Sequence, residues 1–462
     1  MAERDTRTGC PACERLKARV AELEAQLAAA RKHSGNSSKP PSSDIVKPSK
    51  SPPEGEDKRK IGGQPGHPRH ERPAFPPELI DEPHDYTLEQ CPDCGGKLQD
   101  AALAPKVIQQ VEILVNPLHI AEHRGQAYWC PKCQQVHYAP LPAEVVKAGL
   151  AGPRLTALVG FLKGACHASF STIRKFLRDV AGVKVSRGQL AKLVQKVSAS
   201  LEQPYDELLA ALPKEARLHV DETGHPDRGD RLWTWCFRAS LYTLYRISPS
   251  RGSDVLVEVL GKEFNGLLGC DYFSAYRKYM KDFGVAVQFC LAHLIRDVKF
   301  LVEHSHAANR RYGRLLLEHL RKLFGTIHRR ESYASEASFR KTLATIRNAL
   351  VTDAILELPK TREAGNLADR FVTHMDSYFR FITTPDVEPT NNLAEQAIRF
   401  VAIHRRMTQG TRGDPGQRWC ERIWTVVATC GQQGRSVFDY LCQTVDAYFH
   451  EAPAPSLIPS EN

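Results

Sequence analysis

The sequence predicts a multidomain α+β protein, in which a short coiled-coil helix, a zinc ribbon and a helical domain precede an α/β domain with an all-helical insertion. Three observations support this fold class. C-x-x-C pairs recur in the first third of the chain, a helical apolar period runs between residues 150 and 212, and short branched or aromatic runs begin near residue 216. The chain therefore divides into successive units of different periodicity.

The composition favours a large protein with a polyanionic partner. The chain has 462 residues, 42% of them hydrophobic, and 63 Lys and Arg against 53 Asp and Glu, a net charge of +10. The N-terminus has no apolar signal core, and no later window approaches the roughly 20 apolar residues of a membrane helix. We therefore expect a cytoplasmic protein without membrane association, in a reducing compartment where paired cysteines bind metal rather than form disulfides.

Residues 1–32 carry a short apolar stripe. Leu16, Val20, Leu23 and Leu27 recur at alternating spacings of four and three, which is typical of a coiled coil. The stripe is barely two heptads long, so it is either a small dimerisation zipper or a lone surface helix. The pair Cys10 and Cys13 stands before it, and two cysteines per chain bind metal only weakly or across a dimer. We expect a homo-oligomer through this helix.

Residues 33–80 are too polar to bury a core. They contain Asn-Ser-Ser-Lys-Pro-Pro-Ser-Ser-Asp at 36–44 and Gly-Gly-Gln-Pro-Gly-His at 62–67, followed by Arg69, His70 and Arg72. The segment is either a solvated linker or a basic extended arm that lies along DNA phosphates or in a minor groove.

Residues 81–145 have the pattern of a zinc ribbon. Two C-P-x-C knuckles flank an apolar, strand-like segment at 107–115. Four thiolates surround one zinc ion tetrahedrally, and the glycines after the first knuckle permit a tight turn around the sulfurs. We expect one structural Zn²⁺, held by Cys91, Cys94, Cys130 and Cys133.

Residues 150–212 read as helices, with a helix at 171–178, a glycine-bearing turn, and a second helix for which Ser186 is a suitable N-cap. This arrangement is either a DNA-reading helix-turn-helix or an ordinary helical hairpin. In the first case Arg187, Gln189 and Lys192 would contact DNA.

From residue 213 to 450 the pattern changes to that of an α/β domain, followed by a tail at 451–462. The expected elements are strands 217–221, 233–237 and 242–247, helix 253–260, strand 266–271, helix 275–282 and strand 285–289. The order β-β-β-α-β-α-β is that of a ribonuclease-H-like sheet, in which the first and fourth strands are neighbours. Asp221 and Asp271, at the expected ends of these strands, would then converge at one sheet edge.

Converging carboxylates suit Mg²⁺, a hard ion that binds oxygen, and two such ions stabilise the attacking and leaving oxygens of phosphodiester chemistry. The best third carboxylate is Glu395, on a helix whose start is marked by Pro389 and Thr390. The same helix has an expected buried stripe and a separate polar face. The stripe comprises Leu393, Ala397 and Phe400, and the polar face comprises Asn392, Glu395 and Arg399.

Simpler interpretations remain for these carboxylates. Asn392 and Glu395 have the spacing of a capping box, which would make the glutamate a device of the helix start. An aspartate at a strand end is often only a turn former. Glu222 is a rival metal ligand, although strand alternation points it away from Asp221.

The ordered set of motifs resembles the transposases of the insertion sequence 66 group over almost the whole chain. The blocks are the short zipper, the segments at 36–44 and 62–67, the C-P-x-C-G-G ribbon, and the segments at 219–224, 270–276 and 391–399. The resemblance implies a DDE transposase that cleaves and joins DNA at the ends of a bacterial insertion sequence. It implies Asp221, Asp271 and Glu395 as the acidic triad with two Mg²⁺ or Mn²⁺ ions, and DNA as the partner. Whether accessory proteins of the element are also partners is left open by the sequence.

Cys290 and His293 lie in a segment that also resembles this group. They are either a helix start with a solvated histidine or groups that support the triad or substrate. Residues 294–385 read as an all-helical insertion whose basic faces are solvated or line a DNA path. Two departures from the family pattern are Gln396, where relatives commonly carry arginine, and the loosely matching segment 405–413. A catalytically inactive DNA-binding regulator and a ribonuclease-H-like nuclease without strand transfer are the alternative functions.

Overall fold

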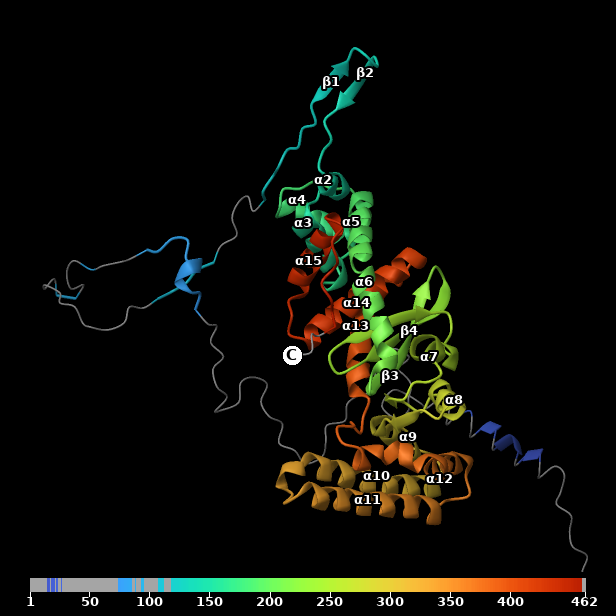
Figure 1. Ribbon diagram of the computed structural model, residues 1–462. Helices are drawn as coiled ribbons and strands as arrows, with labels where there is room; N and C mark the ends of the chain where they lie inside the picture. The colour runs from blue at the N-terminus through green and yellow to red at the C-terminus, as the bar shows by residue number, and fades with distance from the viewer. Residues whose placement is uncertain are drawn as a thin grey trace, which may run out of the picture. The chain divides into compact units, whose positions relative to one another are not determined.

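The computed structural model describes residues 118–458 without a gap, together with 74–84, 88, 93–94, 107–111 and scattered positions between 15 and 26 (Figure 1). Two compact units divide the chain: Ser49–Ala121 forms one, and Met1–Pro48 with Glu122–Asn462 forms the other. Each unit is described by itself.

Within Ser49–Ala121, two hydrogen bonds join Phe75 to Gln109, and a short 3-10 helix, η2 (Pro77–Leu79), follows Phe75. The Phe75 N–H donates to Gln109 Oε1 at 2.6 Å, and Gln109 Nε2 donates to the Phe75 carbonyl at 2.9 Å. Residues 107–111 form no strand, and Val107, Ile108 and Val111 are exposed. The expected strand at 107–115 is therefore not formed over its described part.

The described positions of the N-terminal segment are helical, as predicted. Leu16, Val20 and Leu23 are exposed on them, so no other residue that the structure describes covers this part of the apolar stripe. Leu27, Cys10 and Cys13 lie outside the described residues, as do the segments at 36–44 and 62–67. The zipper and the basic arm thus stay predictions.

A β-hairpin, β1 (Ala127–Cys130) paired antiparallel with β2 (Gln135–Tyr138), leads into a helical unit. The helices of this unit are α2 (Ala143–Ala148), α3 (Pro153–Gly164), α4 (Phe170–Asp179), α5 (Arg187–Ser200) and α6 (Glu202–Ala211), and η3 (Leu212–Lys214) ends it. The helix α15 (Val437–Phe449) packs against α3 and α5, and Lys147 Nζ donates to the Tyr448 carbonyl at 2.5 Å.

One segment, Ala143–Gly164, is long and apolar enough for a membrane span, with a mean hydropathy of 1.3. This corrects the expectation that no window approaches that length. The segment is α2 and α3 with a turn between them, and Gly149 adopts a positive φ of 66° at that turn. Because α3 packs against α5 and α15, its apolar side chains belong to the core of the helical unit.

A five-stranded sheet in the order β5-β4-β3-β6-β7 forms the centre of the next part. Its strands are β3 (Arg217–Asp227), β4 (Asp230–Arg238), β5 (Thr243–Ser248), β6 (Leu267–Cys270) and β7 (Ala286–Phe289). β3 and β5 each pair antiparallel with β4, and β6 pairs parallel with both β3 and β7. The predicted pairing of the first and fourth strands is confirmed.

Helices cover both faces of this sheet. The helices α7 (Ser253–Leu260) and α8 (Ser274–Phe283) lie on one face, where Trp235 of β4 meets Tyr276 of α8 edge to face at 6.0 Å. The helices α13 (Asn392–Thr408) and α14 (Asp414–Gln432) lie on the other, where the Tyr245 hydroxyl donates to the Ala397 carbonyl at 3.0 Å. Adjacent residues of a strand therefore face different helices.

The region between β7 and α13 is helical, as predicted. It consists of α9 (Leu291–Val302), α10 (Ala307–His328), η4 (Arg330–Ser332), α11 (Glu336–Leu356) and α12 (Arg362–Thr383). The helix α10 packs against both α9 and α11 (Figure 1). The helix α12 packs on β7, and this contact attaches the insertion to the sheet edge.

The helix α13 buries a different stripe from the one expected. Its buried residues include Ala394, Ala397 and Val401, whereas Leu393 is exposed and Phe400 is half-buried. Of the three residues expected in the buried stripe, only Ala397 is buried. Contacts made before the helix begins fix its rotation, as the next subsection describes.

Candidate active site

Asp221 lies inside β3, because the strand continues to Asp227 as one arm of a hairpin with β4. The expectation that Asp221 ends the strand is therefore wrong. The pairing of β3 with β6 stops earlier, at His219 and Gly269. Beyond that point the β6 side of β3 is open, and Asp271, the residue directly after β6, comes level with Asp221.

The two aspartates form a half-buried, mutually repelling group. Burial raises the pKa of Asp221 well above its usual range, and the charges of Glu222, Asp271 and Glu395 raise it further. Burial also raises the pKa of Asp271. Asp221 accepts the Glu222 N–H at 3.0 Å, and Asp271 accepts the Phe273 N–H at 2.9 Å, so single backbone donors orient both carboxylates.

Glu395 enters this group from the first turn of α13. One of its oxygens, Oε2, lies 3.2 Å from Arg296 Nη2, and the other, Oε1, lies 3.5 Å from His293 Nδ1. Both Glu395 Oε1 and His293 Nδ1 are buried without a hydrogen-bond partner among the described residues. Ligand atoms of Cys290, His293 and Glu395 all lie within 4.8 Å of one another.

The capping-box interpretation of Glu395 does not hold. The N-cap of α13 is Asn391, and no side chain caps the helix. Asn391 is buried instead, where its Nδ2 donates to the Val220 carbonyl at 2.8 Å and its Oδ1 accepts from His219 Nδ1 at 3.0 Å. Its N–H also donates to Cys290 Sγ at 3.1 Å. These contacts fix the start and rotation of α13, and so the place of Glu395.

Gly269 makes this arrangement possible. A Cβ at this position would lie 2.8 Å from His219 Nδ1, closer than side-chain atoms approach. His219 reaches Asn391 across this glycine. β6 thus has a glycine at the point where the His219 ring of the neighbouring strand β3 passes over it.

Glu222 faces the α8 side of the sheet, as strand alternation predicts, and it is fully buried. Arg251 donates to its Oε1 through Nε at 2.9 Å and Nη2 at 2.7 Å. The Tyr276 hydroxyl donates to its Oε2 at 2.5 Å. Burial, and then the charge of Asp271, raise the pKa of Glu222 to about 7, while Arg251 opposes this.

This donor set fits a hard divalent cation. Three half-buried carboxylates repel one another, and a Glu395 oxygen without a hydrogen-bond partner among the described residues lies 3.5 Å from a His293 nitrogen that also has none. Oxygen-rich sets of this kind suit Mg²⁺ or Mn²⁺. Burial raises the pKa of the Cys290 thiol to about 11, and its sulfur accepts the Asn391 N–H, so Cys290 is not a ready thiolate ligand.

The expected DNA-reading helix pair is formed by α4 and α5, with Ser186 as N-cap of α5, as predicted. Gln189 closes a capping box with Ser186, at 2.8 and 3.1 Å, and Arg187 Nη2 donates to Ser171 Oγ of α4 at 2.7 Å. Lys192 is exposed. Of the three residues expected to contact DNA, two thus have side chains held by contacts within the helix pair.

The expected zinc ligands are only partly described. Cys130 ends β1, Cys133 lies in the following turn, and Cys133 Sγ lies 3.3 Å from His137 Nε2. Cys91 lies outside the described residues, and Cys94 belongs to the other compact unit. The hairpin therefore presents one C-x-x-C pair in a knuckle, and the four-cysteine site stays a prediction.

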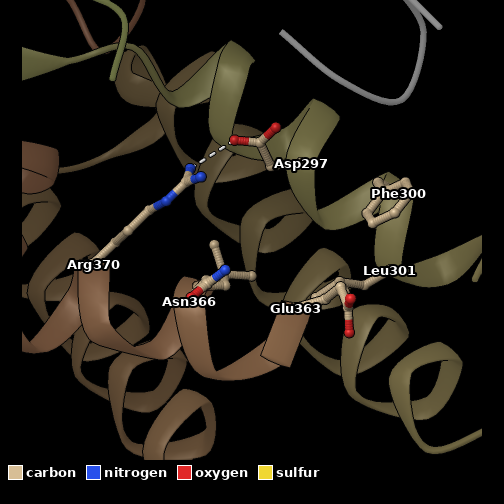
Figure 2. A pocket seen from close by; sticks show the side chains of 7 residues that line it. Asp297, Phe300, Leu301, Glu363, Asn366 and Arg370 are labelled. Atoms are coloured by element: carbon tan, nitrogen blue, oxygen red, sulfur yellow. Dashed lines mark hydrogen bonds and ion pairs between the residues drawn. The ribbon is translucent and has the colours of Figure 1, made fainter. Parts of the chain in front are cut away.

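A pocket of about 110 Å³ lies between α9 and α12 (Figure 2). Arg370 and Asp297 form an ion pair of 2.6 Å there, and the Arg370 guanidinium lies 4.4 Å from the Tyr272 ring centroid. Because Tyr272 directly follows Asp271, this contact supports the carboxylate cluster from the helical insertion. Arg370 and Asp297 of this pocket are thus already paired with each other.

Three residues around the carboxylates were not predicted from the sequence. Asn391 and Arg296 lie inside segments that carry family motifs, and Arg251 lies in the loop before α7, which carries none. An Asn-Asn pair and an arginine one turn after His293 were the available signals. Their partners come from distant strands, which the sequence pattern does not reveal.

Comparisons with known proteins agree with this geometry. Residues 148–418, more than half of the chain, match the family described as "Transposase IS66 family", and residues 11–73 match a family of unknown function. Two relatives from Sinorhizobium fredii are described as uncharacterized proteins. One, y4qI, is 24% identical over 79% of this chain and 72% of its own length, and the other, y4jD, is 25% identical over 75% and 70%.

Proposed function

The chain belongs to the IS66 family of DDE-type transposases, and on this premise we propose that Asp221, Asp271 and Glu395 are its acidic triad. With them the protein cleaves DNA at the ends of a bacterial insertion sequence and joins those ends to a target. One observation carries the proposal: β3, the end of β6 and the first turn of α13 bring Asp221, Asp271 and Glu395 together, close enough that Asp271 and Glu395, with Glu222, add to the rise that burial causes in the pKa of Asp221.

The sheet supports the same assignment. Its strand order and directions, with three antiparallel-linked strands followed by two parallel ones, are those of a ribonuclease-H-like sheet. In such a sheet the first and fourth strands present their carboxylates side by side. The helical insertion then separates Asp271 from Glu395 in sequence and returns the chain at Asn391.

Two divalent ions, Mg²⁺ or Mn²⁺, would be held by Asp221, Asp271 and Glu395 and would stabilise the attacking and leaving oxygens of the reacting phosphodiester. Arg296 and His293 hold Glu395 between them at 3.2 and 3.5 Å and fix its carboxylate toward Asp221. Cys290 anchors Asn391 through its sulfur, so its role is structural support.

DNA is the partner that membership of a transposase family implies. Asn392 and Arg399 are exposed on the outer face of α13, beside Glu395, and we assign them to DNA phosphates near the reacting bond. Arg187, Gln189 and Lys192 belong to the α4–α5 pair proposed to recognise the element ends. Oligomerisation through the N-terminal helix, one structural Zn²⁺, accessory proteins of the element and a cytoplasmic location complete the proposal.

The test uses the full chain, Mg²⁺ and duplex DNA that carries the ends of its own element. Asp221→Asn, Asp271→Asn and Glu395→Gln are each expected to abolish cleavage and joining while DNA binding is retained. Glu388→Gln, at an exposed position just before α13, is the control and should react at the wild-type rate. A fully active Glu395→Gln protein would reject the third ligand.

The alternative functions predict different products. A catalytically inactive regulator binds the ends and leaves them intact, and a nuclease without strand transfer gives nicked DNA without joined products. Independently of activity, Mn²⁺ should raise the thermal unfolding midpoint of the wild type and should not raise that of Asp221→Asn. Without metal, Asp221→Asn should be slightly more stable than the wild type, because it removes a buried repelling charge.

A further inference from the structure

Arg251 lies at the same sheet edge as the carboxylates. β3, β5 and β6 run in one direction, because β3 and β5 are both antiparallel to β4 and β6 is parallel to β3. Their carboxyl ends therefore meet at one edge. Arg251 stands just after β5, in the turn that leads to α7.

Glu222 holds the Arg251 guanidinium by one side only. Nε and Nη2 both donate to Glu222 Oε1, at 2.9 and 2.7 Å, and Nη1 makes no hydrogen bond to any residue that the structure describes. The Glu222 side chain is 1% exposed, whereas that of Arg251 is 39% exposed. An inner carboxylate thus anchors an arginine whose outer edge reaches solvent.

Aromatic rings fix the plane of the same guanidinium. Its central carbon lies 4.4 Å from the Trp233 ring centroid and 3.9 Å from that of Phe273. The Phe273 N–H donates to Asp271 Oδ1, so the turn that orients this carboxylate also seats Arg251. The charge of Arg251 lowers the pKa of Asp271, which is consistent with their proximity.

A cluster of carboxylates repels DNA, and a fixed arginine beside it offsets that repulsion. Guanidinium groups donate parallel hydrogen bonds to phosphate oxygens, and these charge-assisted bonds are stronger than neutral ones. An arginine that served only to neutralise Glu222 would not need an outer edge open to solvent.

We propose that Arg251 binds a phosphate of the DNA strand next to the reacting bond, and that Glu222 is a positioning residue that holds its guanidinium. This inference rests on the proposed function, because it needs DNA at the carboxylate edge. It also implies that Glu222 belongs to the substrate-binding arrangement although it faces away from Asp221.

The experiment pairs protein variants with single neutral phosphates in the DNA. Element-end duplexes carry one methylphosphonate at each position around the cleavage site, and binding is measured at several salt concentrations in Ca²⁺. Arg251→Ala should weaken the binding of unmodified DNA by about tenfold or more and reduce the slope of log affinity against log salt by about 0.9. At one position, replacing the phosphate with a methylphosphonate should lower the DNA affinity of the wild type and leave that of Arg251→Ala unchanged.

Arg251→Lys should restore part of the charge and little of the phosphate selectivity, since lysine cannot match the paired donors. Glu222→Gln should reduce the difference between the selected phosphate and its neighbours, because the amide no longer fixes the guanidinium. Arg246→Ala is the matched control: Arg246 also pairs with a glutamate, Glu258, at 2.6 Å, but lies within β5 and away from the edge. It should leave every phosphate effect unchanged.

If Arg251→Ala and wild type lose affinity equally at every neutral phosphate, the inference is wrong, whether or not the variant is less stable. Failure of the proposed function gives a different result. In that case the wild type makes no cleaved or joined product in Mg²⁺, although the phosphate effects in Ca²⁺ persist.

Discussion

Replacing Asn391 with alanine should destabilise the protein and displace Glu395 together. Asn391 is 1% exposed, and its side chain joins the start of α13 to β3 by two hydrogen bonds, to the Val220 carbonyl at 2.8 Å and to His219 Nδ1 at 3.0 Å. Since Nδ2 must donate to the carbonyl, Oδ1 is the acceptor and His219 donates to it. Alanine leaves the buried Val220 carbonyl and the half-buried His219 Nδ1 unpaired.

The expected cost follows from those two groups. A buried polar group that loses its partner costs about 1 to 3 kcal/mol, so the loss of both partners should lower the unfolding free energy by about 2 to 6 kcal/mol. Asn392 is the adjacent residue, is exposed, and provides the control, for which Asn392→Ala should cost less than about 0.5 kcal/mol.

Urea unfolding followed by tryptophan fluorescence measures this difference, because Trp235 and Trp424 are buried in the sheet and in α14. A second readout is the stabilisation by Mn²⁺, which should be smaller in Asn391→Ala because Glu395 is no longer held in place. Equal urea midpoints for Asn391→Ala and Asn392→Ala would refute the reasoning, since the two hydrogen bonds would then hold nothing in place.

Three further predictions concern a buried acid, the zinc site and the α5 helix. Burial raises the pKa of Glu421 to about 7, above its ordinary 4.5, so stability should fall as pH rises between these values. Over this range the unfolding free energy of Glu421→Gln should fall by up to about 3 kcal/mol less than that of the wild type. A difference in unfolding free energy between the two proteins that is the same at pH 4.5 and at pH 8 would contradict this. Cys130→Ser should lower the zinc content of freshly purified protein, as metal analysis would show, and an unchanged content would reject this ligand. Lys192→Ala should weaken preference for element ends without changing stability, whereas Gln189→Ala should cost about 1 kcal/mol through its lost cap in a thermal unfolding experiment. Equal effects of these two changes on end preference would assign the helix pair to scaffolding.

The order of strands and helices in the sheet could be predicted because each element shows its own periodicity. The helix at 253–260 is observed with those bounds, and the strand expected at 285–289 is β7 (Ala286–Phe289). The extension of β3 past Asp221 could not be predicted. Gly224 and Pro226 are typical of turns, but pairing with β4 through Asp227 and Asp230 overrides that local preference.

The three carboxylates brought together by the fold were also predictable, since their segments carry distinctive motifs. Their supports were not, because each is a long-range contact. Asn391 meets Cys290 across 101 residues and Val220 across 171. Alternation correctly placed Glu222 on the other face of the sheet from Asp221, yet it could not show that Arg251 lies against it.

The packing of α15 on α3 and α5 has a consequence for synthesis of the chain. Lys147 of the neighbouring helix α2 and Tyr448 of α15 are in contact and 301 residues apart, so translation at about 5 to 20 residues per second separates them by roughly 15 to 60 s. Throughout that interval the nascent helical unit exposes the apolar faces that α15 later covers. The ribosome thus delays completion of this unit until the sheet and the insertion have emerged, and chains released early would present those faces to chaperones and proteases.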